Sequence, residues 1–425
     1  MADTIFALSS GAPPAAIAII RVSGPDAARA MLALAGQLPP ARRAITTILH
    51  APDGGPLDRA LVLWLPGPGT ATGEDCAEFH LHGGRAVISA VEGALALVPG
   101  LRPAQAGEFT RRAFINGRID LAEAEGLADL LSAETELQRQ SALALAGGDF
   151  SRTVDSWRQR LLSLSARVEA ELDFAEDDDS IRLGPEFVRD VAGLDEELDK
   201  WLARPRAELL REGFRVVLAG PPNAGKSTLF NALVECEAAI TSPIPGTTRD
   251  VVARPVGIAG LPFLFLDTAG LREATADPVE RTGIDRARNE LDRADLILWL
   301  GPVAECPPGA WNIAARCDEP GQPAKATPRH RVSALTGEGL AALRADLVAT
   351  ARAALPRPGD AALGSRHHRL LGEARAALEE AAGLTDPLLI AESLRLARVA
   401  FDALLGRTAT EDMLDALFGR FCIGK

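Results

Sequence analysis

Residues 214–231, FRVVLAGPPNAGKSTLFN, decide the fold of the chain's middle third and the organisation around it. An apolar run ends at Leu218 and Ala219, the pattern G-x-x-x-x-G-K-S extends from Gly220 to Ser227, and a helical segment follows. Between a buried strand and a helix N-terminus, this pattern predicts a phosphate-binding loop. Its glycines let backbone N–H groups point at phosphate oxygens, where the helix dipole adds favourable potential. A glycine-rich turn before an ordinary helix is the alternative.

Individual side chains of this segment have separate expected roles. Lys226 is expected to reach the β- and γ-phosphates, and the Ser227 hydroxyl is expected to hold Mg²⁺. Lysine is rare in this chain, which uses arginine for nearly all of its 45 basic residues. A compact ammonium fits a phosphate cradle that a planar guanidinium does not. The predicted nucleotide-binding residues here are Asn223, Ala224, Gly225, Lys226, Ser227 and Thr228.

Two later segments complete the pattern of a GTPase with two switch loops. In SPIPGTTRD, residues 242–250, Thr248 can supply a second hydroxyl to Mg²⁺. The apolar strand LPFLFL leads directly into the D-x-x-G that begins at Asp267, which contacts the metal shell and senses the γ-phosphate. The residues predicted to bind nucleotide in these segments are Ser242, Pro243, Ile244, Pro245, Gly246, Thr247, Thr248, Asp267, Thr268, Ala269 and Gly270.

The part that would recognise the base departs from the usual GTPase pattern. Where N-K-x-D is normal, residues 315–318 are A-R-C-D. Asp318 can still accept hydrogen bonds from guanine N1 and N2, which adenine does not offer, while the missing Asn removes a contact worth roughly 1 kcal/mol. Ser333 and Ala334 are predicted to lie in the loop whose backbone N–H contacts the guanine oxygen. Only about ten residues separate ADLILWL from the next strand, too few for a crossover helix, so this edge of the domain is expected to be shortened.

The composition of the chain limits which classes of protein and of binding site it can form. A chain of 425 residues, 47% hydrophobic, can build two or three domains with real cores. The sequence has neither a membrane-length apolar run nor a signal peptide at MADTIFALSS, so a soluble cytoplasmic protein is expected. The five cysteines form no C-x-x-C pair, which supports neither a disulfide framework nor a zinc site. A net charge of −13 argues against broad nonspecific binding of nucleic acid.

The first 118 residues alternate strand and helix patterns, which predicts a compact α+β domain. IAIIRV, ALVLWL and AEFHLH are the expected strands, and GPDAARAMLALAG and the segment from Gly83 to Leu97 are the expected helices. Arg21 and Glu78 carry more polar chemistry than a scaffold needs, although their spacing alone favours a solvated strand edge. The basic segment 102–118 is either a solvated turn or a surface for an anionic ligand or RNA.

The remaining segments are helical and lie on both sides of the nucleotide-binding part. Apolar residues recur at helical spacing from Ile119 to about Arg211 and again after the linker PRPGD. The acidic run 176–179 is interpreted as a solvated loop rather than a metal site, and His367 and His368 as solvated helix positions. The predicted division is 1–118, 119–212, 213–350 and 351–425, with the third segment inserted into one helical domain.

Motifs along nearly the whole chain resemble one family, the tRNA modification GTPase MnmE, also called TrmE. The most specific are IAIIRVSG, GEDCAEFHLHGG, GEFTRRAFINGRIDLAEAEGLADLL and the terminal FCIGK, which accompany GPPNAGKSTLFN, PGTTRD, DTAGLRE and SALTGEGL. The resemblance implies a fold of mixed α/β and α class: an N-terminal α+β domain that dimerises and binds folate, a discontinuous helical domain, and an inserted Ras-like P-loop GTPase domain.

The resemblance also implies a folate site and a possible thiol nucleophile. By matching positions, 5-formyltetrahydrofolate or a related reduced folate would contact Arg21, Glu78, Arg118 and Lys425. Arg118 departs from the family's usual Lys but keeps the charge. Glutamate can bond the donor face of a pterin, and the basic side chains can meet the carboxylates of the folate tail. Cys422 is either a nucleophilic thiol near that site or a small buried apolar residue.

For hydrolysis, the resemblance implies a cation-assisted mechanism. A K⁺ ion would be held by Asn223, Ser242, Ile244 and Thr247, and would supply the transition-state charge that an arginine finger gives elsewhere. Glu280 matches the family's water-positioning glutamate, although the loop before it is one residue longer. Together with Lys226 and Cys422, it completes the predicted catalytic set. Two GTPase domains would meet across their switches, so hydrolysis is expected to need a homodimer.

The implied reaction adds an aminomethyl or carboxymethylaminomethyl group to C5 of the wobble uridine, U34, of certain tRNAs. A flavoprotein partner, MnmG (GidA), would contribute FAD and much of the RNA-binding surface in a heterotetramer. Two other functions fit part of the sequence. One is a ribosome-assembly GTPase that acts as a switch without folate chemistry, and the other is a folate-dependent transferase whose GTPase is only regulatory.

Overall fold

Two compact units make up the computed structural model, which describes residues 3–173, 183–235, 252–267, 290–319 and 325–425. One unit joins Met1–Ala128 with Asp402–Lys425, and the other is Asp129–Phe401. Within these described ranges, every helix is too short or too polar to cross a lipid bilayer.

The first unit contains a six-stranded sheet in the order β3-β4-β5-β2-β1-β6. All neighbours are antiparallel except β1 and β6. The three strands expected from the sequence are β4, β5 and β2, and the structure adds three more. Half of the positions of β3 are exposed and β6 is very short, so neither carries a strong apolar pattern. The strands are β1 (Thr4–Leu8), β2 (Ile17–Ser23), β3 (Ile45–His50), β4 (Pro56–Leu65), β5 (Cys76–His82) and β6 (Leu101–Pro103).

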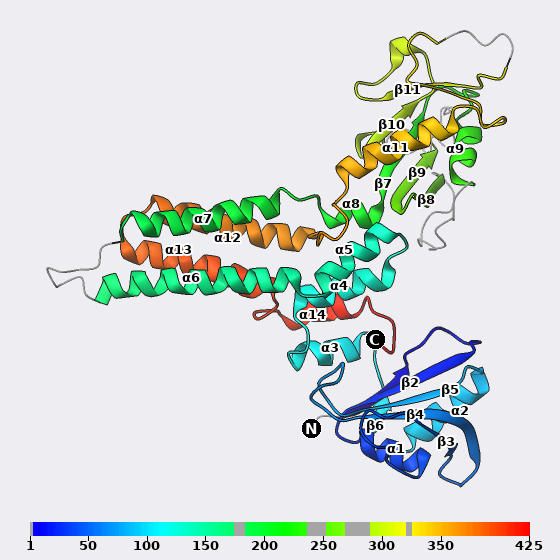
Figure 1. Ribbon diagram of the computed structural model, residues 1–425, viewed down its shortest axis with the longest axis vertical. Coiled ribbons are helices and arrows are strands. Elements are labelled where there is room, and N and C mark those ends of the chain that lie inside the picture. Colours follow the sequence, from blue (N-terminus) through cyan, green and yellow to red (C-terminus); the bar gives the residue numbers. More distant parts are fainter. Residues whose placement is uncertain (1–2, 174–182, 236–251, 268–289, 320–324) are drawn as a thin grey trace, which may run out of the picture. The chain divides into compact units, whose positions relative to one another are not determined.

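Each face of this sheet packs against different helices (Figure 1). Helices α1 (Ala27–Ala35) and α2 (Arg85–Ala96) cover the face that presents Ile20, Val22 and Phe79. On the other face, Ile5 and Ala7 pack against Phe109 of α3 (Glu108–Ile115). Because side chains alternate along a strand, Arg21 lies on this second face, away from α1 and α2. The predicted α+β domain is therefore present, with one sheet face left for polar chemistry.

The C-terminal tail docks onto the first unit instead of fraying. Helix α14 (Glu411–Phe418) packs with α3 and the start of α4 (Leu121–Ser132). Beyond it, Ile423 forms a bridge with Ala106, and the Phe109 N–H donates to the Lys425 carbonyl at 3.2 Å. Gly424 has φ +93°, and a Cβ there would lie 2.0 Å from the Leu8 carbonyl oxygen. Only glycine fits this position, so the tail has one defined path.

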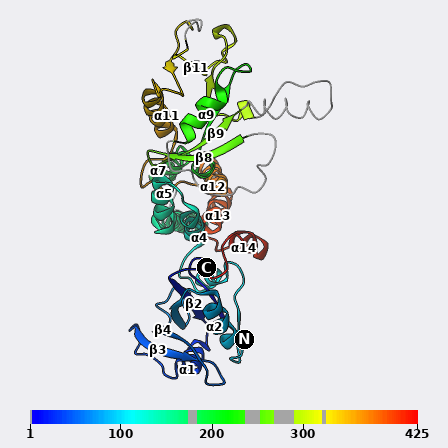
Figure 2. The same ribbon diagram turned by 90° about the vertical axis from the view of Figure 1, so that its right-hand side faces the viewer.

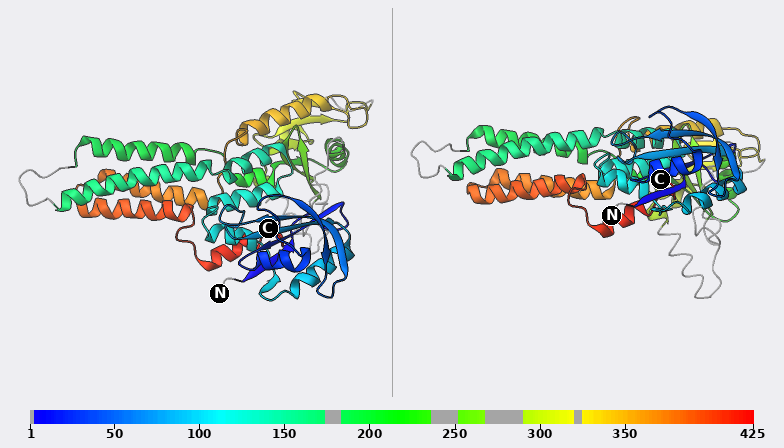
Figure 3. Two further views of the ribbon diagram at one scale, coloured as in Figure 1. Left: turned by 60° about the horizontal axis from the view of Figure 1, so that its bottom comes forward. Right: turned by 90° about the horizontal axis from the view of Figure 1, so that it is seen from below.

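The second unit contains a bundle of four long helices that lie side by side (Figure 3). Its core includes Trp157, which is 1% exposed and donates its indole N–H to Glu197 at 2.8 Å. The prediction that His367 is solvated is wrong. This side chain is 2% exposed, packs edge-on against Phe150, and accepts a hydrogen bond from the Gly364 N–H. The helices are α6 (Asp149–Asp173), α7 (Pro185–Leu202), α12 (Ser365–Gly383) and α13 (Pro387–Leu404).

A second six-stranded sheet, in the order β12-β11-β10-β7-β9-β8, forms the rest of this unit. All neighbours are parallel except β8 and β9, and α9 (Lys226–Val234) and α11 (Leu340–Ala354) lie beside the strands (Figure 2). Only a 3-10 turn, Val303–Glu305, links β10 to β11, which confirms the shortened edge. The strands are β7 (Phe214–Ala219), β8 (Val252–Ile258), β9 (Leu261–Asp267), β10 (Leu296–Trp299), β11 (Trp311–Ala315) and β12 (His330–Val332).

Helices α5 (Glu136–Ala146) and α8 (Ala207–Glu212) join this sheet to the bundle. Leu137 of α5 belongs to the core of the sheet, and its N–H donates to the Gly260 carbonyl in the β8–β9 turn at 3.1 Å. The segment that leads into the sheet domain and the segment that leads out of it lie side by side, since the Ala207 N–H donates to the Leu363 carbonyl at 3.0 Å. The sheet is therefore an insertion within the helical domain, and the fold class predicted from the sequence is confirmed.

Candidate functional site

The carboxyl ends of four strands gather the predicted nucleotide-binding residues at one edge of the second sheet. The phosphate loop follows β7, Asp267 ends β9, and the segments before Asp318 and after Val332 follow β11 and β12. Asp267 pairs in register with Leu218, just before the loop. Ligands of open parallel sheets bind outside this edge. The arrangement brings the described members of the predicted set together.

The phosphate loop has the geometry that its pattern predicted. Gly220 has φ +146°, and a Cβ there would lie 2.9 Å from the Gly301 backbone nitrogen, so a side chain is excluded. Gly225 precedes α9 in a left-handed conformation. Among the loop residues, Asn223, Ser227 and Thr228 are exposed, while Ala224 and Gly225 are half-buried. The loop therefore presents its backbone and the Ser227 hydroxyl to solvent at the start of a helix, where an anion binds favourably.

Lys226 is the buried cation of this site. Its side chain folds over the loop, and Nζ donates to the carbonyls of Gly220 at 2.9 Å and Pro221 at 2.8 Å. Burial lowers the pKa of the Lys226 ammonium, and the charge of nearby Asp267 opposes this shift. Phosphate oxygens carry negative charge and are stronger acceptors than these neutral carbonyls. The ammonium is thus placed to exchange loop carbonyls for phosphate oxygens.

The segments predicted to bind guanine emerge from neighbouring strands. β11 and β12 are parallel, with Ala315 opposite Val332, and the Cys317 N–H donates to the Val332 carbonyl at 3.2 Å. Asp318, on the first of these segments, is exposed. On the second, Ser333 is fully buried and its hydroxyl accepts from the Thr336 N–H at 3.1 Å. Ala334 follows it and is half-buried. Asp318 is thus exposed at the carboxyl end of β11, while Ser333 fixes the shape of the neighbouring loop.

One contact between these loops was not predicted from the sequence. Arg316 Nη1 donates to the Asn223 carbonyl of the phosphate loop at 3.1 Å, and Arg316 Nε donates to Glu319 at 2.6 Å. Arg316 and Asn223 both have positive φ, 59° and 60°. Side-chain type alone does not reveal such a conformation in a non-glycine residue, because it depends on how the two loops meet.

Part of the predicted site lies outside the described residues. This applies to the predicted switch, K⁺-binding and water-positioning residues Ser242, Pro243, Ile244, Pro245, Gly246, Thr247, Thr248, Thr268, Ala269, Gly270 and Glu280. The acidic run 176–179 lies outside them as well.

The first unit brings two of the predicted folate residues into direct contact. Arg21 and Glu78 are opposite each other on β2 and β5, and Arg21 Nε and Nη2 donate to Glu78 Oε1 at 3.1 and 3.0 Å. His80 Nε2 lies 3.2 Å from the other Glu78 oxygen. The solvated-edge interpretation is wrong, because β2 and β5 are central strands. Sequence reasoning missed His80, although its spacing of two residues from Glu78 places both on one strand face.

The other predicted folate residues border the loop between β4 and β5 and the docked tail. A Cβ at Gly73 would lie 3.2 Å from Arg118 Cγ, so Arg118 packs on the loop. Lys425 is half-buried at the end of the tail and follows Gly424, which lies against the Leu8 backbone; the register partner of Leu8 on β2 is Ile20. Cys422 is exposed, which excludes its alternative interpretation as a buried apolar residue. All four predicted folate residues thus belong to a single compact unit.

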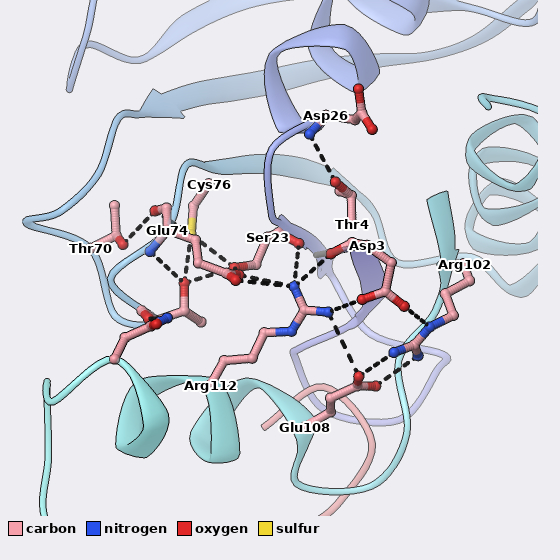
Figure 4. A network of polar contacts seen from close by, with 12 residues as sticks. Asp3, Thr4, Ser23, Asp26, Thr70, Glu74, Cys76, Arg102, Glu108 and Arg112 are labelled. Atoms are coloured by element: carbon pink, nitrogen blue, oxygen red, sulfur yellow. Dashed lines mark hydrogen bonds and ion pairs between the residues drawn. The ribbon is translucent and has the colours of Figure 1, made fainter. Parts of the chain in front are cut away.

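Within the basic segment 102–118, Arg102 and Arg112 are paired with acidic side chains of the first unit (Figure 4). Arg112, only 11% exposed, donates to Glu74 at 3.0 Å and to Asp3 at 2.7 Å. Arg102 is bonded to Asp3 and to Glu108. Arg111 pairs with acidic side chains of α14. These arginines fix the β4–β5 loop and α3 to the sheet, so their charges are compensated by the protein.

Sequence and structure comparisons place the chain among known proteins. Residues 4–118 match the family described as "GTP-binding protein TrmE N-terminus", and residues 121–422 match "MnmE helical domain". The tRNA modification GTPase MnmE of Novosphingobium aromaticivorans is 63% identical over 437 residues, covering 100% of both chains. That of Erythrobacter litoralis is 62% identical over 423 residues, again covering 100% of both.

Among solved structures, the G domain of the FeoB iron transporter of T. maritima is 24% identical, with a TM-score of 0.25. It covers 32% of this chain and 98% of that one. The full-length relatives and the two family matches, together spanning nearly every residue, are decisive. This chain belongs to the MnmE (TrmE) family of tRNA modification GTPases.

Proposed function

We propose that this protein binds and hydrolyses GTP to drive modification of tRNA at C5 of the wobble uridine, U34. The group added is of the aminomethyl or carboxymethylaminomethyl type, and the flavoprotein MnmG is the partner that contributes FAD. The observation that carries this proposal is the position of Lys226. It lies buried at the helix N-terminus of a complete phosphate loop, in a chain that belongs to the MnmE family throughout its length.

The residues around the phosphate loop have complementary roles in this proposal. The loop N–H groups and Lys226 bind the phosphates, and Asp318 accepts hydrogen bonds from guanine. Mg²⁺, when bound, would neutralise charge at the β- and γ-phosphates, and the residues that would hold it are Ser227 and Thr248. The exposure of Ser227 and the buried carboxylate of Asp267 fit a hard cation that prefers oxygen ligands.

Hydrolysis is proposed to depend on K⁺ and on a second copy of the chain. Asn223, Ser242, Ile244 and Thr247 would hold the ion, which supplies positive charge beside the phosphates, and Glu280 would orient the attacking water. The exposed Asn223, next to the phosphates, is a suitable donor of an oxygen ligand. Replacing Na⁺ with K⁺ is expected to raise turnover severalfold, whereas equal rates in the two salts would remove the ion from the mechanism.

A reduced folate is the proposed ligand of the first unit. Arg21, Glu78, Arg118 and Lys425 would contact it, and the folate would supply a one-carbon unit when bound. The sheet face fits such a ligand, because Glu78 presents carboxylate oxygens to a pterin donor edge while basic groups border the site. Cys422 is exposed on the tail and is proposed to act near this site. Glu78 is already held by Arg21 and His80, so its orientation is set before a ligand arrives.

The nucleotide state is proposed to move the helical domain. β8 and β9 pair from Val252 opposite Asp267 to Ile258 opposite Leu261. At the turn of this hairpin, Gly260 accepts from the N–H of Leu137, the residue of α5 that belongs to the sheet core. A change at Asp267, next to the γ-phosphate, can therefore reach α5 through one hairpin.

The remaining expectations complete the proposed assembly. Residues 1–118 form the dimerising folate domain, 119–212 and 351–425 the helical domain, and 213–350 the GTPase domain. The working complex is a cytoplasmic heterotetramer of two copies of this chain with two of MnmG. The acidic net charge of −13 supports a division of labour in which the partner provides much of the tRNA-binding surface.

Nucleoside analysis of tRNA tests the proposal directly. In cells that lack this protein, the modified wobble uridine is expected to disappear, and the wild-type gene should restore it. A Lys226→Ala variant should not restore it, since nucleotide binding is lost. An unchanged wobble-uridine profile in the deletion strain would contradict the tRNA assignment. Restoration by Lys226→Ala would instead indicate a transferase whose GTPase is only regulatory.

A further inference from the structure

One face of the second sheet is only partly covered at β11 and β12. Parallel sheets are normally buried on both faces by the helices that connect their strands, but the link from β10 to β11 provides only a 3-10 turn. Ala314 and Arg331 are register partners on this face, and they are half-buried and exposed, respectively. Their neighbours Ile313 and Val332 point to the opposite face and are at most 1% exposed. The described residues therefore leave room on the side of Ala314.

A cavity of about 650 Å³ lies beside Ala314 and Arg331. Its apolar wall includes Leu300 and Val303, which follow β10. It also touches the outer part of the phosphate loop, at Pro221, Asn223 and Ala224. The described residues predicted to hold Mg²⁺ and the guanine base lie outside its lining, namely Ser227, Asp318, Ser333 and Ala334. The cavity therefore borders the proposed nucleotide site without including the places of the metal and the base.

Lys325 places a half-buried ammonium in this cavity. Its Nζ donates to the backbone carbonyls of Ile313 at 2.7 Å and of Trp299 at 3.1 Å. Burial lowers the pKa of the Lys325 ammonium, and the nearby Cys306 sulfur opposes this shift. Among the described residues, its bonded partners are these two neutral carbonyls. Lys325 thus has the same kind of environment as Lys226, which also rests on two backbone carbonyls.

The other charged side chains of the lining leave the cavity positive. Arg316 and Glu319 form an ion pair with each other, so their charges cancel. Arg331 is exposed and adds a second cation to that of Lys325. The chain as a whole has a net charge of −13, so this positive cavity is a local feature that favours an anion.

We propose that this cavity binds a small organic anion, whose charged group pairs with Lys325 and whose apolar body lies against Leu300 and Ala314. Anionic oxygens are stronger acceptors than backbone carbonyls, so the ammonium would exchange neutral partners for a charged one. The volume lies within the range of about 300–1,000 Å³ for small-molecule sites, which combine apolar walls with a few polar groups. A protein partner would need roughly 800 Å² of surface from this chain, the scale of a whole face rather than of one cavity.

A pair of fluorescent dyes tests this proposal. Anilinonaphthalene sulfonate is an organic anion, and N-phenylnaphthylamine has the same aromatic body without the sulfonate. The full-length protein is titrated with each dye in Mg²⁺ and saturating GDP, so that the nucleotide site is filled. Lys325→Met keeps most of the side-chain length and removes the charge. Its affinity for the sulfonate should fall about tenfold, the value of one charge-assisted hydrogen bond, while its affinity for the uncharged amine should not change.

Three further variants locate the dye and control for folding. Ala314→Leu fills part of the cavity and should weaken the binding of both dyes. Arg331→Gln alters an exposed side chain and should weaken the sulfonate alone, by about threefold, as expected for a solvent-exposed ion pair. Lys200→Met, at an exposed lysine of α7, is the matched control and should bind both dyes as the wild type does.

Unchanged sulfonate affinity in Lys325→Met would overturn the proposal. An equal loss for both dyes would overturn it as well, because it would mean that Lys325 only ties β10 to β11. If Lys325→Met does not fold, Arg331→Gln decides, and unchanged sulfonate affinity there rejects the site. If saturating GDP displaces the dye whose binding depends on Lys325, the cavity belongs to the nucleotide site and the proposal fails. If the protein binds no GDP at all, the proposed function falls while this inference stands.

Discussion

The two candidate sites of this molecule hold their charges in different ways. At the phosphate loop, the buried ammonium of Lys226 rests on two neutral carbonyls of its own loop. In the first unit, Arg21 is already bonded to Glu78, and Arg112 to Asp3 and Glu74. A phosphate at the first site would therefore replace weak partners, whereas an anion approaching Arg21 would meet a charge that Glu78 already compensates. The comparison indicates that the phosphate loop is suited to strong anion binding and the Arg21–Glu78 pair to orienting a neutral or mixed-polarity edge.

Removing the cation of the phosphate loop should have the largest effect. Lys226→Ala deletes two charge-assisted hydrogen bonds to phosphate, at ~1.5 kcal/mol each, so GTP affinity should fall about 100-fold and hydrolysis should become undetectable. Fluorescence titration with a labelled GTP analogue measures the affinity. Binding of 5-formyltetrahydrofolate by the same variant should match the wild type. If folate binding also disappears, the two sites are not independent, and the contrast between the phosphate loop and the first unit fails.

The first site could be predicted from the sequence because its geometry is mainly backbone geometry. Gly220 must approach the backbone of Gly301, and Gly225 must precede the helix in a left-handed conformation, so both positions carry glycine in a fixed pattern. The shortened β10–β11 connection followed from residue counting alone. What the pattern could not give was the contact of Arg316 with Asn223, since it depends on how two loops from different strands meet.

The second site should respond most strongly to loss of its central carboxylate. Glu78→Gln keeps the shape but removes the charge that holds Arg21 and that would bond a pterin donor edge. We expect the affinity for 5-formyltetrahydrofolate to fall about 30-fold, within the ~1.5–3 kcal/mol typical of charged hydrogen bonds. Isothermal titration calorimetry measures the change. Asp53→Asn, an exposed carboxylate in the β3–β4 turn, is the matched control and should bind normally. Equal affinities in wild type and Glu78→Gln would exclude Glu78 as a contact.

The residues of this second site were assigned by resemblance, and the structure explains why chemistry alone did not find them. Arg21 and Glu78 lie 57 positions apart and become partners only through the register of β2 and β5. Arg102 and Arg112 have acidic partners in Asp3, which precedes β1, in the β4–β5 loop and in α3. A local count of basic residues therefore overestimates the exposed charge. His367 was misassigned for a related reason, because bundle packing buries a polar helix position.

Docking of the C-terminal tail provides a smaller and independent test. A methyl group at Gly424 would collide with the Leu8 carbonyl, so Gly424→Ala should undock the tail and remove Lys425 from the site. The expected loss of folate affinity is about tenfold, the value of one charge-assisted hydrogen bond at ~1.5 kcal/mol. Lys425→Ala should produce the same loss while leaving the tail docked. Limited proteolysis should cleave the tail faster in Gly424→Ala only. A tail that stays protected in that variant would contradict the steric argument.

The smallest expected effect concerns acid stability, where two glutamates of the first unit should behave in opposite ways. Burial raises the pKa of Glu108, but the hydrogen bond from Arg102 and the charges of Arg102 and Arg112 outweigh it, so the folded pKa lies below its ordinary value. Glu108 therefore stabilises the fold above its unfolded pKa of about 4.3, and this contribution is lost as the pH falls through the folded pKa. Burial raises the pKa of Glu92, which therefore costs stability at neutral pH and costs nothing in acid.

Thermal denaturation at pH 7 and at pH 3, monitored by far-ultraviolet circular dichroism, distinguishes the effects of Glu108 and Glu92. Glu108→Gln should narrow the difference in the Tm of the first unit between the two pH values by about 2–4 °C, the shift that ~1 kcal/mol produces in a unit of about 150–250 residues. Glu92→Gln should widen it, because the substitution removes a penalty present only at neutral pH. A change of the same sign in both variants would mean that the arginines do not hold Glu108 ionised. The charge compensation that distinguishes this unit from the phosphate loop would then be absent in solution.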